Sequence, residues 1–188
     1  YPHKHWHVDI KYLNFKGSFL FLISVLDGYS RYVLSHEVRH TMNEYDVQLT
    51  IQKAKDKYPF ARPRIITDNG SQFIAKEFKI FIKDAEFTHV KTSVSNPQAN
   101  GKIERYHRTI SQECLRVKSS VDLDGFIFYV KEYINFYNTQ RLHASLNYLT
   151  PEDYLLGRHQ EKIKQRELKL EKAETNRAQY WEARNNAA

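Results

Sequence analysis

Apolar side chains recur at every second position near the start of the chain, from Trp6 to Tyr12. This spacing is the period of a β-strand that buries one of its two faces. The intervening positions are polar and comprise His5, His7, Asp9 and Lys11. The pattern therefore predicts a half-buried strand on which Asp9 points away from the apolar face.

Two more strands are predicted directly after the first. Residues 19–27 are almost continuously apolar, as in the central strand of a sheet, and residues 31–38 form a third short apolar segment. Turn residues at 16–17 and 28–30 separate the three segments. Short connections of this kind predict an antiparallel meander of three strands.

The period then changes from that of strands to that of helices. Thr41 and Glu44 have the spacing of a capping box, which predicts a helix from there to about Lys57. The next predicted elements are a strand at 64–68, a helix at 75–85, a strand at 87–92 and a helix that begins at 102. This order predicts an α/β fold, a five-stranded mixed sheet flanked by helices.

The C-terminal part of the chain is predicted to be helical. Residues 123–140 are rich in aromatic side chains, and Thr150 before Pro151 is typical of an N-cap followed by proline at the first helical position. Residues 161–184 contain no Gly or Pro and many charged residues, which predicts a long, solvated helix. A coiled-coil seam stays open, because apolar residues recur every seven positions at Leu156, Ile163 and Leu170.

We therefore divide the chain into a core domain of residues 1–156 and a charged helical tail of residues 157–188. The net charge of +7 and the pI of about 9.3 favour a polyanionic partner, but they do not choose between DNA, RNA and an acidic membrane surface. The chain has no apolar run long enough to span a bilayer and no secretory signal, so we expect a soluble, cytoplasmic protein. The single cysteine, Cys114, is interpreted as a small, semi-buried apolar residue.

Three carboxylates dominate the candidate chemistry: Asp9 on the first strand, Asp68 at the end of the fourth, and Glu104 on the following helix. Ligands gather at the carboxyl ends of strands in α/β sheets. Carboxylate oxygens suit hard cations such as Mg²⁺, which keep open positions for water and substrate phosphates. On its helix Glu104 shares a polar face with His107, Arg108 and Ser111.

At these residues the chain resembles the catalytic core of retroviral integrases and bacterial insertion-sequence transposases, the D,D,E recombinases. Thirty-five residues separate Asp68 from Glu104, TDNGSQF resembles the block around the second family aspartate, and NGKIERYHRT resembles the glutamate helix. YNTQRLHASLNYLTPEDYL is similar to the ending typical of bacterial insertion-sequence enzymes. Several linked motifs in the right order make a chance match improbable.

The resemblance implies an RNase H-like fold in which Asp9, Asp68 and Glu104 bind two Mg²⁺ or Mn²⁺ ions. It also implies metal-dependent DNA cleavage and strand transfer on transposon ends and a target duplex, by a homo-oligomer at the bacterial nucleoid. End recognition is expected to reside in an N-terminal module outside these residues. The expected DNA contacts are Lys102, Arg105, Arg108, Arg141 and His143, together with Asn96, Gln98 and Asn100 in a loop that gates the site.

Other interpretations stay open at this point. The chain could be a related nuclease that only hydrolyses, or a catalytically silent scaffold that binds DNA or a partner. An Asx turn would explain Asp68 without a metal, and Asp27 is interpreted as a turn residue. A zinc site at His3, His5 and His7 is disfavoured, because structural zinc normally needs a fuller ligand set.

Overall fold

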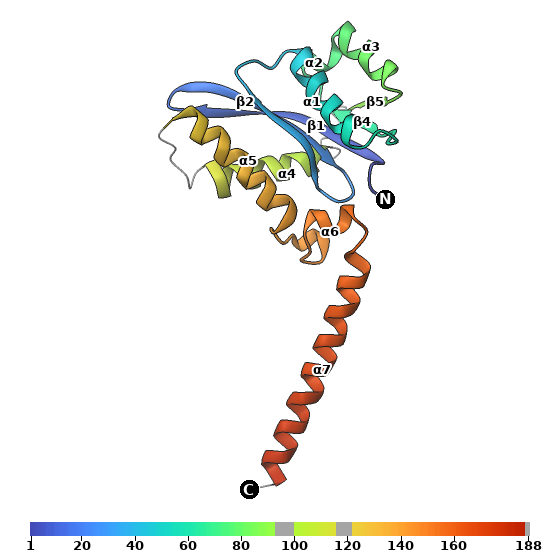
Figure 1. The fold of residues 1–188 in the computed structure, drawn as a ribbon, viewed down its shortest axis with the longest axis vertical. Helices are drawn as coiled ribbons and strands as arrows, with labels where there is room; N and C mark the ends of the chain where they lie inside the picture. Colours follow the sequence, from blue (N-terminus) through green and yellow to red (C-terminus); the bar gives the residue numbers. More distant parts are fainter. Residues whose placement is uncertain (93–99, 116–121, 187–188) are drawn as a thin grey trace.

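A computed structural model describes residues 1–92, 100–115 and 122–186 of the chain. Its centre is a five-stranded sheet with the strand order β3-β2-β1-β4-β5 (Figure 1). The strands are β1 (His5–Phe15), β2 (Ser18–Asp27), β3 (Val33–Arg39), β4 (Arg64–Thr67) and β5 (Thr88–Lys91). Strands β1 to β3 pair antiparallel, whereas β4 pairs parallel to both β1 and β5. The predicted meander and the mixed sheet are therefore confirmed.

A two-residue turn fixes the register of the first hairpin. Phe15 pairs with Ser18, so that only Lys16 and Gly17 connect β1 to β2. Both residues have positive φ angles, of 49° and 87°, as a tight hairpin turn of this length requires. The Asn14 side chain accepts a hydrogen bond from the Gly17 amide at 3.0 Å and stabilises the turn.

Helices cover both faces of the sheet (Figure 1). On one face lie α1 (Glu44–Lys57), α2 (Ser71–Ile74) and α3 (Lys76–Asp84), and on the other lie α4 (Gly101–Ile110) and α5 (Leu123–Thr139). The first face packs around Trp6, Val8 and Phe78, and the second packs Ile103 and Tyr106 of α4 against the sheet. The polar face predicted for β1 is thus not open to solvent, and His7 is only 2% exposed because α4 crosses it.

The start of α1 differs from the predicted capping box. Asn43 is the N-cap residue, and its side chain accepts a hydrogen bond from the Asp46 amide at 2.9 Å. Thr41 lies outside the helix and donates its hydroxyl to the Asp46 carboxylate at 2.5 Å. Thr and Asn are both favourable N-cap residues. Asn43 caps the helix because it directly precedes the first helical residue, which is Glu44.

The helix α4 continues into a π-helical turn, Ser111–Leu115. The Ser111 hydroxyl donates to the His107 carbonyl at 2.8 Å at the point where the hydrogen-bonding pattern changes. Cys114 is 4% exposed and packs with the second core cluster, which confirms its interpretation as a buried apolar residue.

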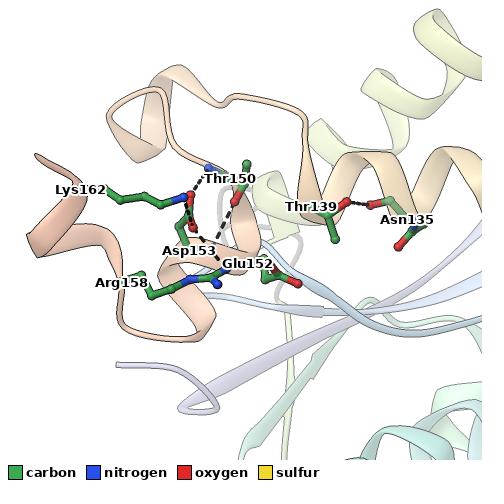
Figure 2. A network of polar contacts seen from close by, with 7 residues as sticks. All are labelled: Asn135, Thr139, Thr150, Glu152, Asp153, Arg158 and Lys162. Carbon is green, nitrogen blue, oxygen red and sulfur yellow. Dashed lines mark hydrogen bonds and ion pairs between the residues drawn. The ribbon is translucent and has the colours of Figure 1, made fainter. Parts of the chain in front are cut away.

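The last helices are α6 (Pro151–Leu155) and α7 (His159–Asn186), and α7 projects far beyond the rest of the molecule (Figure 1). Thr150 and Asp153 form a capping box with Pro151 at the first helical position, as the sequence predicts. The Asp153 side chain is only 2% exposed, and its carboxylate forms ion pairs with Lys162 at 2.7 Å and with Arg158 at 3.3 Å (Figure 2). These ion pairs join α6 to the first turns of α7.

In the described part of the chain, no helix combines the length and apolar character needed to cross a membrane. The division at residue 156 stays a prediction.

One prediction concerns His36 on β3. Its Nε2 atom is buried without a hydrogen-bond partner among the described residues, and burial lowers the pKa of His36 to about 4. The folded state therefore keeps the ring neutral, whereas the unfolded chain takes up a proton near pH 6.5. The stability that His36 contributes is present above pH 6.5 and is lost as the pH falls toward 4.

We expect the free energy of unfolding of the wild type, relative to His36→Gln, to fall by up to about 2 kcal/mol between pH 7 and pH 5. Urea denaturation at both pH values measures it. The exposed His40 supplies the control, since His40→Gln should leave the pH dependence of the wild type intact. Equal slopes for the wild type and His36→Gln would contradict the assignment.

Candidate active site

The register of the sheet aligns the first two candidate carboxylates. In the parallel β1–β4 ladder each pair differs by 59 in sequence number, from His5 with Arg64 to His7 with Ile66. The same offset aligns Asp9 with Asp68, which directly follows β4. Side chains at matched positions of parallel strands share one face of the sheet. Continuation of this register therefore assigns both carboxylates to the face that α4 covers.

Asp9 lies under α4. One of its carboxylate oxygens accepts a hydrogen bond from the Ile10 amide at 2.8 Å, and the other lies 3.4 Å from Nδ1 of His107. His107 is 8% exposed, although the sequence assigns it to the polar face of its helix. The contact with Asp9 therefore fixes where α4 crosses β1.

Glu104 precedes His107 on α4 by about one helical turn. Its carboxylate is exposed and makes no hydrogen bond or ion pair with any described residue. The opposite side of the helix is buried, as predicted, with Ile103, Tyr106 and Ile110 each at most 1% exposed. Packing of the apolar side thus leaves Glu104 exposed to solvent.

Asp68 occupies a turn after β4. Its Oδ1 accepts a hydrogen bond from the Gly70 amide at 2.9 Å, and Asn69 donates to the Thr92 carbonyl at 3.1 Å. The Asx turn considered from the sequence is therefore present. It uses one carboxylate oxygen of an exposed side chain, and the other oxygen makes no hydrogen bond with a described residue.

The donor set fits a hard divalent cation in its chemistry, because all three residues offer carboxylate oxygens. Among the described residues, which include all three, no group of at least three His, Cys, Asp or Glu side chains lies close enough to hold a metal ion. Asp9, Asp68 and Glu104 therefore do not form such a group, and their assignment as metal ligands stays a prediction. His3 is engaged elsewhere, since Trp6 Nε1 donates to its ring at 3.2 Å.

A buried polar cluster lies beside this region. Burial lowers the pKa of His7 to about 4, and neither ring nitrogen makes a well-formed hydrogen bond with a described residue, although the Asn100 side chain approaches the ring. Asn100 is itself 5% exposed, and its side-chain oxygen has no partner in the described part of the chain. The residue predicted to contact DNA is therefore buried at the start of α4.

The other residues predicted to bind DNA fall into three environments. Arg105 and Arg108 are exposed on α4, and Lys102 donates its ammonium group to the Gly28 carbonyl at 2.9 Å. Arg141 makes two hydrogen bonds to the Glu113 carboxylate, at 2.8 and 2.6 Å. His143 packs edge-on against Tyr137, and burial lowers its pKa to about 4. Two further residues lie outside the described ones, Asn96 and Gln98.

The turn between β2 and β3 contains one predicted turn residue, Asp27, and one residue that the sequence analysis missed, Arg31. Asp27 is fully buried and accepts hydrogen bonds from the His3 and Ser30 amides at 2.7 Å, which confirms it as a turn residue. Arg31 has a left-handed φ of 64° and donates to the same Gly28 carbonyl as Lys102. The only signal in the sequence was a charged residue at the end of a short turn.

A family model described as an integrase core domain matches residues 1–97, just over half of the chain, and a second model with the same description matches residues 86–151. The chain belongs to the integrase core domain family.

Two curated relatives are a putative integrase of Spiroplasma virus SpV1-C74 and the transposase for insertion sequence element IS904 of Lactococcus lactis. The first is 33% identical over 58% of this chain and 33% of its own length, and the second is 25% identical over 81% of this chain and 61% of its own length. The chain thus spans less than two thirds of either relative.

The catalytic core of HTLV-2 integrase, solved in a dimeric form with magnesium, matches with a TM-score of 0.63 at 18% identity, over 82% of this chain and 97% of that one. The fold is therefore the RNase H-like fold of retroviral integrase cores, as expected.

The close approach at Gly28 gives a prediction for stability. A Cβ atom at this position would lie 2.9 Å from His7 Nε2 and 3.2 Å from the His5 carbonyl oxygen. Gly28→Ala should therefore force the turn away from β1 and lower the free energy of unfolding by about 1–3 kcal/mol. Urea denaturation measures the change.

Gly101→Ala is the matched control, because no described atom lies within 4 Å of its added Cβ. Alanine in a helix is favoured over glycine, so this variant should be neutral or more stable by up to about 1 kcal/mol. An equal effect of the two substitutions would contradict the packing of Gly28 against His7.

Proposed function

We propose that this chain is the catalytic core of a DNA transposase that cleaves a DNA strand and joins the new 3′-hydroxyl to a target duplex. The observation that carries the proposal is the β1–β4 register, which ends at His7 with Ile66 and, if continued by two residues, would match Asp9 with Asp68 on the face crossed by the helix of Glu104. Family membership supports the reaction class, since the family is that of integrase cores. The two successive steps are phosphoryl transfers at the same centre.

Asp9, Asp68 and Glu104 would hold the divalent ions, two Mg²⁺ or Mn²⁺ in our proposal. When bound, such ions supply activation of the attacking oxygen and stabilisation of the leaving oxygen in an in-line displacement. The protein orients the ligands through its backbone: the Ile10 amide holds Asp9, and the Gly70 amide holds Asp68.

The position of His107 gives it a role in this site. Its ring lies 3.4 Å from Asp9, and α4 carries both His107 and Glu104. We therefore propose that His107 is a positioning residue, which sets the distance between the helix of Glu104 and the strand of Asp9. Its buried ring suits this purpose, because a packed side chain has few alternative rotamers.

The relatives support the substrate and the assembly. One is a transposase for an insertion sequence element, and the HTLV-2 integrase core is described with magnesium and as a dimer. We propose accordingly that the substrates are transposon ends and target DNA, and that the chain acts as a homo-oligomer in the bacterial cytoplasm, at the nucleoid. The net charge of +7 is consistent with a DNA partner.

The central prediction is loss of catalysis in the acidic variants. Asp68→Asn and Glu104→Gln should each reduce DNA nicking and joining by at least about 100-fold. Loss of a residue that merely hydrogen-bonds to a metal ligand costs up to about 100-fold, and loss of the ligand itself should cost more. Both side chains are exposed, so the fold should be preserved. A fluorescent assay with a labelled transposon end measures both steps.

Exposed acids on α3 provide the controls: Glu77→Gln and Asp84→Asn should keep full activity. Nicking without joining by the wild type would favour a hydrolytic nuclease, and DNA binding with neither step would favour a scaffold. If Asp68→Asn nicks and joins DNA as fast as the wild type, Asp68 is not a metal ligand.

A second prediction uses stability in place of activity. A ligand that binds only the folded state raises the free energy of unfolding, by about 2.7 kcal/mol at one hundred times its dissociation constant. Mn²⁺ or Mg²⁺ should therefore raise the Tm of the wild type, and this rise should be smaller in Glu104→Gln. Ca²⁺ also takes carboxylate ligands, so a rise in Tm with Ca²⁺ would report metal binding without DNA cleavage. Equal shifts in both proteins would contradict metal binding by Glu104.

A further inference from the structure

A second site lies on a different side of α4. A cleft of about 600 Å³ is bounded by the first half of α4, the turn between β2 and β3, and the segment that follows α5. Its described lining residues include no carboxylate, and the polar ones central to the argument are Arg31, Lys102, Arg105, Thr109, Arg141 and Ser145. A concave surface with this composition has a strongly positive potential.

Two cations converge inside the cleft. The Arg31 guanidinium and the Lys102 ammonium group both donate to the carbonyl oxygen of Gly28, with Lys102 at 2.9 Å. Like charges held this close repel each other. The nearest acid is Asp27, whose oxygens already accept hydrogen bonds from neighbouring backbone amides and the Ser30 hydroxyl. The structure thus concentrates positive charge that a bound anion would balance.

The remaining basic residues differ in how far their charge is balanced. Arg141 is paired with Glu113, whose carboxylate also accepts from the Tyr133 hydroxyl at 2.7 Å. Arg105 is exposed and makes no ion pair with a described residue. Among the described residues, no ion pair is formed by the three other cations of the cleft, Arg31, Lys102 and Arg105.

The cleft and the acidic centre use different sides of one helix. Lys102, Arg105 and Thr109 follow each other at three- and four-residue spacing along α4 and line the cleft. Glu104 and His107 are offset from them around the helix, on the side that faces Asp9. An anion in the cleft would consequently lie apart from the phosphate at the acidic centre.

The outer wall of the cleft is held in place from α7. Arg166 donates to the carbonyl oxygens of Asn147 and Tyr148, at 2.6 and 3.2 Å. Both of these residues have left-handed φ angles, of 52° and 55°. The ends of their loop are joined by a hydrogen bond from the His143 amide to the Leu149 carbonyl oxygen at 3.1 Å. The wall that contains Ser145 and Tyr148 is therefore fixed before any ligand arrives.

We propose that this cleft binds a phosphate group of a nucleic-acid backbone, as a contact separate from the scissile phosphate. Guanidinium forks and an ammonium group with nearby hydroxyls match the several oxygens of a phosphate. The assignment of that phosphate to a DNA strand rests on the proposed function. The phosphate-binding chemistry itself rests only on the charges and the shape of the cleft.

The test is the salt dependence of DNA binding. Binding of a fluorescent duplex to the full chain is measured by anisotropy in EDTA, between 50 and 200 mM salt, for the wild type, Arg105→Gln and Lys102→Gln. Each phosphate contact contributes about 0.9 to the slope of log K against log salt. Each variant should therefore bind roughly fivefold more weakly at low salt and lose about 0.9 of the slope.

Lys79→Gln is the matched control, because it removes the same charge from an exposed position on α3, across the sheet. Arg105 makes no contact on which the fold depends, so Arg105→Gln keeps the test valid even if Lys102→Gln unfolds. An unchanged slope for Arg105→Gln alongside an unchanged slope for Lys79→Gln would overturn the proposal.

Inorganic phosphate separates the two sources of the ligand. If millimolar phosphate raises the Tm of the wild type while the variants keep normal DNA affinity, the cleft binds free phosphate and the DNA assignment is wrong. Failure of the cleft proposal and failure of the proposed function can be told apart. If the wild type binds DNA through the cleft but never nicks it, only the proposed function is wrong. If the wild type nicks and joins DNA while the salt dependence of binding is unchanged in Arg105→Gln, only the cleft proposal is wrong.

Discussion

The position of β1 between β2 and β4 is the constraint on which the rest of the structure depends. This strand pairs antiparallel on one edge and parallel on the other, and helices pack against both of its faces. Continuation of its parallel register with β4 by two residues would match Asp9 with Asp68, and Asp9 contacts His107 of α4. A slip of one residue in that register would send the two carboxylates to opposite faces.

The helix α4 serves three purposes because its sides carry different chemistry. Ile103, Tyr106 and Ile110 pack against the sheet, Glu104 is the third carboxylate of the metal site that we propose, and Lys102 with Arg105 lines the basic cleft. Asp68 and Glu104 are both exposed, so each is accessible to a ligand. This exposure suits the binding of metal and DNA that we propose for them.

The two polar sites are held by elements outside the sheet. The Gly28 carbonyl connects α4 to the β2–β3 turn through Lys102, and Arg166 connects α7 to the loop that walls the cleft. The ion pairs of Asp153 anchor the base of that same helix (Figure 2). The long α7 helix therefore has a role at its base, where it braces the loop beside the basic cleft.

The three candidate carboxylates came from the family-like motifs and their spacing in the sequence. Local periodicity determined the main elements of this protein, their order and the α/β class, because strand and helix spacing and cap residues such as Thr150 act over a few residues. It did not determine that the polar face of β1 is covered, that Asn43 caps α1, or that Arg31 joins Lys102 at one carbonyl oxygen. Those outcomes depend on which elements meet in space. Only the tertiary structure decided them, since contacts between residues far apart in the chain leave no periodic signal in a single sequence.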